Sequence, residues 1–326
     1  MFQLKPLFFV IMIMGTLISI SSTSWFSIWM GLEINMIAFI SILFKNSKSS
    51  AEIIMKLFLI QAIASLSILF FSIFSSLFNL TISNIMMNKY YMIMFPLLLK
   101  MASAPLHFWM PALADGLSWF YLFILISWQK MAPLFLMFNF MFMDLFFIVI
   151  MLNLIIGSVM GINQTSMKKI MIFSSINHMG WMLSSILISE IMFIYYFIIY
   201  MISIIPIILM FYKSNITSLN NLLFNKSKSI MFMLMFSFNI LSMAGLPPFI
   251  GFIMKIIIFN QLKMTMLISI IMILTSLISL FFYTRLIYTS SSIMISMSKI
   301  KYTSKEMYNG IVFSILPSIL IPMIII

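Results

Sequence analysis

Long apolar segments alternate with short polar, lysine-containing connections along the whole chain. A transmembrane helix needs about 20 mostly apolar residues, and about 11 segments fit this requirement. The pattern places them at residues 6–23, 25–44, 52–78, 90–109, 117–138, 143–163, 167–188, 190–212, 229–260, 264–288 and 310–326. We therefore expect an all-α polytopic membrane protein that forms a single transmembrane domain over residues 1–326.

Composition supports a membrane location and limits the chemistry. The chain is 63% hydrophobic and 7% charged, which leaves too little polar surface for a soluble fold. The first apolar segment lacks a convincing signal-peptide cleavage pattern, and the next begins at once at Trp25, so we expect it to remain in the mature protein. The absence of cysteine excludes disulfides and thiolate-held metal centres, and we expect no bound metal or cofactor.

The formal net charge is +12, and the basic residues occupy the connections in an alternating way. No basic helix with interleaved aromatic residues is present, so we expect no nucleic-acid partner. On the predicted topology, two basic residues, Lys89 and Lys263, lie on one side of the membrane. The other side carries Lys5, Lys45, Lys48, Lys56, Lys168, Lys169, Lys213, Lys226, Lys228, Arg285, Lys299, Lys301 and Lys305. Because basic loops stay on the side of synthesis, the N-terminus is expected there and the C-terminus across the membrane.

Four charged residues fall well inside predicted spans, away from their ends: Glu33, Lys100, Lys130 and Lys255. A charged side chain near the bilayer centre costs about 2.5–3.5 kcal/mol, so four of them need a reason. Each lysine lies near residues that break helices, namely Pro105, Pro133 and the segment Gly245-Leu246-Pro247-Pro248. Broken membrane helices commonly line hydrated cavities and ion sites, so we expect a polar path through a helical bundle.

Glu33 is the expected partner of one of these lysines, because the other carboxylates lie at predicted ends or connections. Loss of water around a lysine favours its neutral form, and a nearby carboxylate favours the charged form. A lysine whose carboxylate partner can approach or withdraw can therefore take up and release a proton. The alternative for a lone lysine such as Lys130 is a structural pairing or an extension toward the membrane surface.

The two histidines have different expected roles. His178 lies midway along a predicted span and can relay protons, because the unperturbed pKa of histidine is about 6.5. A neutral His178 that is hydrogen-bonded to serine or asparagine is an equally good interpretation. His107 lies beside Trp109 near a helix end, where packing and capping are expected.

Several motifs resemble the chain 2 family of NADH–ubiquinone oxidoreductase, an antiporter-like membrane subunit of respiratory complex I. They are WMGLEIN at 29–35, KMASAPLHFWMP at 100–111, WQKMAP at 128–133, SSINHMGW at 174–181, and GLPPFIGF at 245–252 followed by Lys255. The resemblance implies inverted repeats of five helices, each with a broken helix. The Asn and Met bias and the single arginine, Arg285, also hint at an organellar genome.

By this resemblance, Glu33 and Lys100 match the glutamate and lysine of a first half-channel. Lys130 matches the central connecting lysine, and Lys255 matches the terminal lysine of a second half-channel. His178 matches a polar position between the halves. Ala112 stands where related sequences often carry a glutamate, so Asp115 receives no relay role.

The resemblance implies a proton-translocating subunit of the mitochondrial inner membrane, with its N-terminus in the matrix and its C-terminus in the intermembrane space. NADH, FMN, iron–sulfur clusters and ubiquinone are then expected in other subunits. Expected partners are the other membrane subunits and lipids, cardiolipin included. Two alternatives remain: a stand-alone cation/proton antiporter, and a structural membrane subunit with a vestigial channel.

Overall fold

The computed structural model describes residues 5–44, 48–77, 83–140, 144–224, 230–247, 249–262 and 266–296. Every regular element in these ranges is a helix, and the one extended pairing is an isolated bridge between Ser166 and Ser218. The all-α prediction is therefore confirmed. The predicted span at 310–326 lies outside the described residues.

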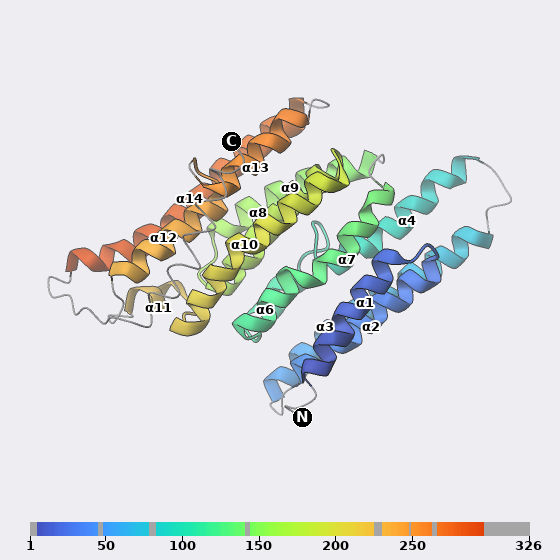
Figure 1. The fold of residues 1–326 in the computed structure, drawn as a ribbon, viewed down its shortest axis with the longest axis horizontal. Helices are drawn as coiled ribbons and strands as arrows, with labels where there is room; N and C mark the ends of the chain where they lie inside the picture. Colours follow the sequence, from blue (N-terminus) through green and yellow to red (C-terminus); the bar gives the residue numbers. More distant parts are fainter. Residues whose placement is uncertain are drawn as a thin grey trace. The chain divides into compact units, whose positions relative to one another are not determined.

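The chain divides into two compact units, and the first comprises Met1–Val149. Its helices are α1 (Lys5–Ser21), α2 (Trp25–Leu43), α3 (Lys48–Leu77), α4 (Ser83–Met101), α5 (Trp109–Ala114), α6 (Trp119–Ile126), α7 (Trp128–Leu136), the 3-10 helix η3 (Met137–Phe140) and the start of α8 (Asp144–Ile162). Helices α1 and α2 lie side by side (Figure 1) because two glycines let their backbones approach. A Cβ atom on Gly31 would lie 2.6 Å from the backbone nitrogen of Ser19.

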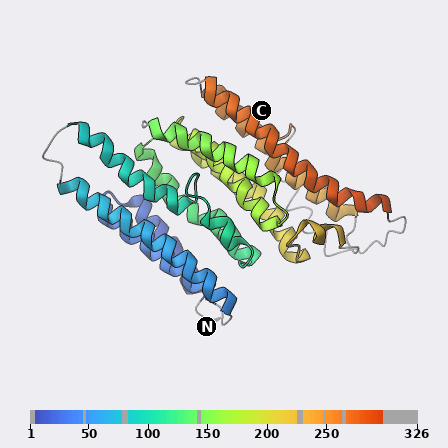
Figure 2. The ribbon, with the colours of Figure 1, turned by 180° about the vertical axis from the view of Figure 1, so that it is seen from behind.

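The second unit comprises Ile150–Ile326. It contains the rest of α8, α9 (Met167–Ile186), α10 (Glu190–Ser214), α11 (Leu219–Phe224), α12 (Ile230–Ala244), α13 (Ile250–Gln261) and α14 (Met266–Ser296). Every residue of α9 except Lys169 is buried, so α9 is the central helix of this unit. Helices α10 and α13 pack against α9, and α12 lies beside α14 (Figures 1 and 2).

Six described helical segments are long and apolar enough to cross a membrane. They are Trp25–Leu43, Ala51–Phe74, Trp119–Phe140, Asp144–Ile162, Glu190–Ser214 and Ile268–Ser290. Shorter apolar helices are Lys5–Ser21, Tyr91–Met101, Phe232–Ala244 and Ile250–Gln261. A polytopic membrane protein is confirmed, whereas the number of about 11 spans stays a prediction.

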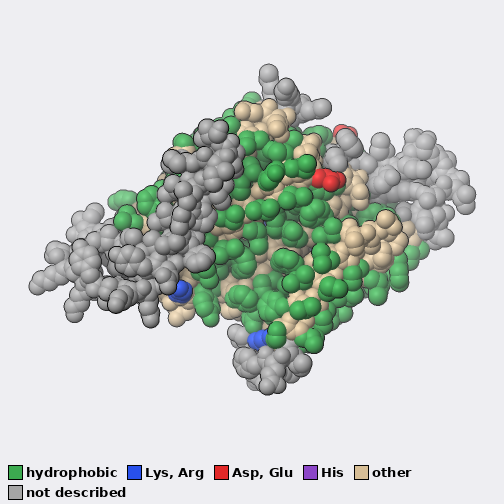
Figure 3. All heavy atoms as spheres, in the orientation of Figure 1, with side chains coloured by type: hydrophobic (Ala, Val, Ile, Leu, Met, Phe, Trp, Pro, Cys, Tyr) green, Lys and Arg blue, Asp and Glu red, His purple; other side chains and the backbone are tan. Residues whose placement is uncertain are grey.

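The outward surface of the described helices is apolar. On α3, one helical face exposes Met55, Leu59, Ile63, Leu66 and Phe70, at intervals of three or four residues. On the face shown in Figure 3, hydrophobic side chains cover most of the described surface, with few charged groups. Such continuous apolar surface would be unfavourable in water and fits contact with lipid.

Three predicted spans are interrupted. Helix α4 ends at Met101, inside the span expected at 90–109, and the span expected at 229–260 breaks between Ala244 and Ile250. The span expected at 117–138 breaks at Ser127.

The break near Lys130 is not where the sequence places it. Pro133 lies inside α7, which continues to Leu136, so the prediction of a break after Lys130 is wrong in position. Proline has no N–H, and it costs α7 one backbone hydrogen bond, to the carbonyl group of Gln129. The helix tolerates this loss, and the chain breaks at Ser127, before the lysine.

Candidate functional site

The broken end of α4 positions Lys100. The backbone leaves the helix at Ala102, which has a φ of 54°, in the left-handed region that non-glycine residues rarely adopt. The carbonyl groups at a helix end need donors in a membrane interior. The indole Nε1 of Trp109 donates to the Leu99 carbonyl at 3.1 Å, and the Ser103 Oγ donates to the Leu98 carbonyl at 3.1 Å. The carbonyl groups of Leu98 and Leu99 at the break beside Lys100 therefore both have hydrogen-bond donors.

Lys100 interacts electrostatically with Glu33 of α2. The lysine side chain is buried, with 6% of its surface exposed. The Oε2 atom of Glu33 is also buried and has no hydrogen-bond partner among the described residues. The structure thus places the carboxylate and the amine that the sequence pairs inside the first unit, where their charges act on each other, without a salt bridge between them among the described contacts.

Lys130 lies in the first turn of α7, directly after the break at Ser127. Its side chain is 2% exposed, so it is the most deeply buried of the three lysines. The Ser127 Oγ donates to the carbonyl group of Phe123, which satisfies the end of α6. The break therefore places an amine at a helix start inside the first unit.

His107 follows the same broken segment as Lys100. Its side chain is buried, its Nδ1 lies 3.2 Å from the Pro105 carbonyl oxygen, and its ring is 4.3 Å from the Phe108 ring. A carbonyl oxygen can only accept, so Nδ1 carries the proton. The packing role predicted for His107 agrees with these contacts.

In the second unit, His178 lies on the buried helix α9 and pairs with a tyrosine. A hydrogen bond of 2.8 Å joins the His178 Nδ1 to the Tyr196 hydroxyl group of α10. The Tyr200 ring, one helical turn further along α10, is 5.1 Å from the imidazole ring. A tyrosine hydroxyl group is therefore one partner of His178, which the sequence does not offer beside serine and asparagine.

Lys255 lies on α13, opposite the end of α12. Its Nζ donates to the Ala244 carbonyl oxygen at 2.7 Å and lies 5.5 Å from the Trp181 ring centroid. Gly245, with a φ of 76°, makes the turn between the helices, and a Cβ atom there would lie 3.0 Å from Lys255 Nζ. Trp181 is one turn from His178 on α9, so Lys255 and His178 border the same region.

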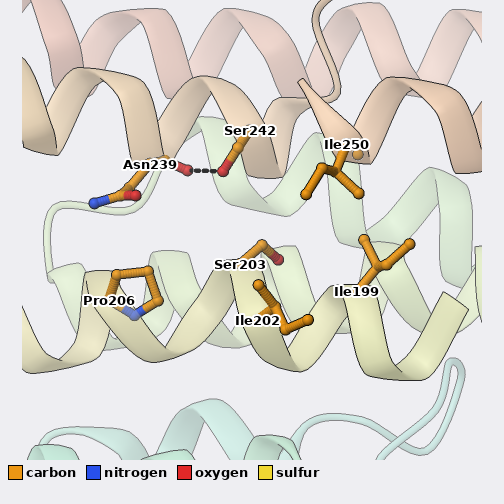
Figure 4. Close-up of a pocket in the computed structure, with 8 residues that line it drawn as sticks. Ile199, Ile202, Ser203, Pro206, Asn239, Ser242 and Ile250 are labelled. Carbon is orange, nitrogen blue, oxygen red and sulfur yellow. Dashed lines mark hydrogen bonds between the residues drawn. The ribbon is translucent and has the colours of Figure 1, made fainter. Parts of the chain in front are cut away.

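A narrow cleft runs between α10 and the α12–α13 break (Figure 4). Its lining is mostly apolar, and the polar side chains in it are Ser203 of α10 and Asn239 and Ser242 of α12. The Ser242 Oγ donates to the Asn239 carbonyl at 2.7 Å.

His178 and Tyr196 line a small adjoining cavity. Ser203 and Ser242 line both this cavity and the cleft. Hydroxyl groups therefore extend the polar surroundings of His178 toward the break. Serine hydroxyls can donate and accept at once, so they can hold water or pass protons.

The five predicted residues thus fall into two groups. Glu33, Lys100 and Lys130 belong to the first unit, and His178 and Lys255 to the second. Several polar side chains that bond or line these sites were not predicted from the sequence, namely Asn35, Gln61, Gln129, Tyr196, Ser203 and Ser242. Their signal was a polar side chain within an apolar run, which is too common for serine and tyrosine to stand out.

The chemistry available in these groups is proton exchange. The three buried amines lie beside helix breaks, whereas the Glu33 carboxylate, the His178 imidazole and the Tyr196 hydroxyl group lie on the continuous helices α2, α9 and α10. Within the described ranges, no group of three or more His, Cys, Asp or Glu side chains could hold a metal ion.

Interrupted membrane helices with buried amines fit an antiporter-type membrane protein, and a family model identifies this class. The family model described as "NADH:quinone oxidoreductase/Mrp antiporter, TM" matches residues 22–281. The NADH-ubiquinone oxidoreductase chain 2 of Anopheles gambiae is 41% identical over 318 residues, which are 95% of this chain and 92% of the relative. The chain 2 protein of Locusta migratoria is 40% identical over 301 residues, covering 88% and 85%. The chain belongs to the NADH:quinone oxidoreductase/Mrp antiporter family, among the chain 2 proteins.

Solved structures share the fold. A chain of respiratory complex I from Thermus thermophilus with bound aureothin matches with a TM-score of 0.81 at 18% identity, over 95% of this chain and 76% of that chain. A chain of the membrane-bound sulfane sulfur reductase, an archaeal respiratory membrane complex, matches with a TM-score of 0.81 at 15% identity, over 97% and 72%.

Proposed function

We propose that the protein is a proton-translocating membrane subunit of NADH:ubiquinone oxidoreductase, respiratory complex I. Its relatives carry the name of chain 2 of this enzyme, and its fold resembles a chain of a complex I structure. Electron transfer takes place in other subunits, which hold NADH, FMN, iron–sulfur clusters and ubiquinone. This chain supplies the proton path and carries no redox centre of its own.

The proposal rests on the burial of Lys100 beside a helix break and on Glu33, whose Oε2 atom is buried without a hydrogen-bond partner among the described residues. When the carboxylate stays near the amine, the charged lysine is favoured; when it withdraws, the buried lysine releases its proton. Charge shifts that start in partner subunits change this separation. The proton then passes to Lys130 and on through His178 to Lys255.

The location follows from the same proposal. The protein spans the mitochondrial inner membrane several times, with its N-terminus in the matrix and its C-terminus in the intermembrane space, as the lysine distribution predicts. Its two compact units are parts of one antiporter-like transmembrane domain, 1–326. The other membrane subunits of complex I cover part of its flanks, and lipids, cardiolipin included, contact the rest.

A stand-alone cation/proton antiporter is the second candidate, because an Mrp complex chain from Dietzia sp. has a similar fold, with a TM-score of 0.74. This chain matches only 61% of the length of the Mrp chain, whereas it matches 92% of the length of chain 2 of Anopheles gambiae, which favours the complex I subunit. Sodium-dependent transport by the isolated chain would favour the antiporter. Transport that requires the redox subunits would favour complex I.

Glu33→Gln tests the proposal, because the variant keeps the shape of the side chain and removes its charge. Assembled complex is reconstituted in liposomes, and protons pumped per electron are measured during NADH oxidation. We expect a lower ratio with Glu33→Gln. The control is Glu52→Gln, at an exposed carboxylate paired with Lys56 on α3, which should leave the ratio unchanged. An unchanged ratio for Glu33→Gln in a fully assembled complex would contradict the proposal.

A further inference from the structure

Two side-chain amides connect the helix of Glu33 with the helix of Lys130. The Nε2 atom of Gln129 donates to the Oδ1 atom of Asn35 at 3.0 Å. Asn35 is two residues after Glu33 on α2, and Gln129 directly precedes Lys130 on α7. Neither amide belongs to the charged set already described.

The Asn35 end of this bond is held in place by the backbone. Asn35 is 3% exposed, and a Cβ atom on Gly15 of α1 would lie 2.7 Å from its backbone nitrogen. Gly15 and Gly31 thus allow α1 to press directly on the α2 backbone beside Asn35. The Gln129 side chain is only partly buried and is long, so it is the member of the pair that can turn.

The Gln129 side chain also borders a cavity that contains Lys100. The cavity has a volume of about 20 Å³, and its polar lining residues are Lys100, Gln61 and Gln129. The Nε2 atom of Gln61 donates to the Lys100 carbonyl oxygen at 3.4 Å. A polar cavity of this size holds about one water molecule, which needs two to four polar partners.

The carboxamide groups of Gln129 and Asn35 limit how this pair can take part in proton transfer. A carboxamide has no proton that it exchanges near neutral pH, so it can orient water but cannot relay a proton as a carboxyl or imidazole group does. Gln129 lines the cavity of Lys100 and directly precedes Lys130 along α7. The bond to Asn35 engages one N–H group of the Gln129 amide, and opening this bond frees that donor for water in the cavity.

We propose that Gln129 and Asn35 form a gate for protons between Lys100 and Lys130, closed while the two amides are bonded to each other. This inference rests on the proposed function of the chain in proton translocation. It assigns positioning roles to two residues that carry no charge.

The variants Gln129→Glu and Gln129→Met test the gate in complex I reconstituted in liposomes. A protonated glutamate keeps the donor to Asn35 and adds an exchangeable proton. With electron transfer inhibited, Gln129→Glu should raise the passive proton conductance of the vesicles severalfold. The double variant Gln129→Glu/Lys130→Met should lose that leak. Gln129→Met removes the donor without adding a proton and should lower the protons pumped per electron.

Gln164→Glu is the matched control, because the Gln164 amide lies at the surface and donates to the Met160 carbonyl at 3.3 Å. It should leave both conductance and pumping unchanged. Wild-type conductance in Gln129→Glu together with wild-type pumping in Gln129→Met would overturn the gate. If those two variants behave as wild type while Glu33→Gln lowers pumping, the gate alone fails. If Glu33→Gln has no effect, the proposed function fails.

Discussion

The amine of Lys255 bonds the carbonyl oxygen of Ala244, the last residue of α12, at 2.7 Å. A cation at this place satisfies one of the free carbonyl groups of a helix end and interacts favourably with the helix dipole. Lys255 therefore has a structural role at the break in addition to its proposed role at the end of the proton path. On the proposed proton path, a proton transfer at Lys255 is coupled to the loss or remaking of this cap.

Replacing Lys255 by methionine should destabilise the α12–α13 junction. A buried carbonyl group left without its donor costs about 1–3 kcal/mol. Thermal inactivation of the assembled complex should occur at lower temperature, and protons pumped per electron should fall. Lys213→Met, at an exposed position in the last turn of α10, is the control. Unchanged thermal inactivation of the Lys255→Met complex would show that the bond to Ala244 is not a stabilising cap.

Gly245→Ala should disturb the same junction through the backbone. Gly245 has a φ of 76°, and an added Cβ would lie 3.0 Å from the Lys255 Cδ and Nζ atoms. The left-handed conformation costs an alanine about 1–2 kcal/mol. Thermal inactivation should again shift to lower temperature, whereas Ser237→Ala on the exposed face of α12 should not shift it. If Gly245→Ala is inactivated at the wild-type temperature, the left-handed conformation described for Gly245 is contradicted.

Gly31→Ala should force α1 and α2 apart. Its Cβ would meet the Ser19 backbone nitrogen at 2.6 Å, and a backbone atom cannot move aside alone. Overpacking of this kind costs about 1–3 kcal/mol. We expect less assembled complex on native gels, while Ser41→Ala, at an exposed position on α2, should give the normal amount. Normal assembly of Gly31→Ala would mean that the helices do not touch as described.

Several features of the site can be predicted from the sequence for physical reasons. Lys100 and Lys255 stand out because a charge within an apolar run is costly, and the Pro and Gly segments beside them mark breaks that the structure contains. The break at Ser127 could not be predicted, because serine is common inside membrane helices and Pro133 was the stronger local signal.

Contacts between residues far apart in the chain could not be predicted from the sequence either. The bond between Gln129 and Asn35 joins residues 94 positions apart and depends on how α2 and α7 pack. The same holds for Tyr196, which the sequence does not distinguish from its neighbour Tyr195. In the structure Tyr196 is 4% exposed and bonded to His178, whereas Tyr195 is 55% exposed.

Tyr196→Phe should weaken proton transfer through His178 without affecting assembly. The variant removes the hydroxyl group that bonds the His178 Nδ1 at 2.8 Å and keeps the ring. Loss of one such hydrogen bond is worth about 1 kcal/mol, or about fivefold in an equilibrium. Protons pumped per electron should fall, and NADH oxidation by the uncoupled complex should persist. Tyr195→Phe is the matched control, and equal pumping by the two variants would remove Tyr196 from the path.

Lys130, at the start of α7, is the most deeply buried lysine of the described residues, and on the proposed path every translocated proton passes it. The most direct test measures protons pumped per electron by reconstituted complex I that carries Lys130→Met, beside Lys56→Met at the exposed pair on α3. We predict a lower ratio for Lys130→Met, with assembly intact, and the wild-type ratio for Lys56→Met. A wild-type ratio in an intact Lys130→Met complex would contradict the account and favour a structural subunit with a vestigial channel.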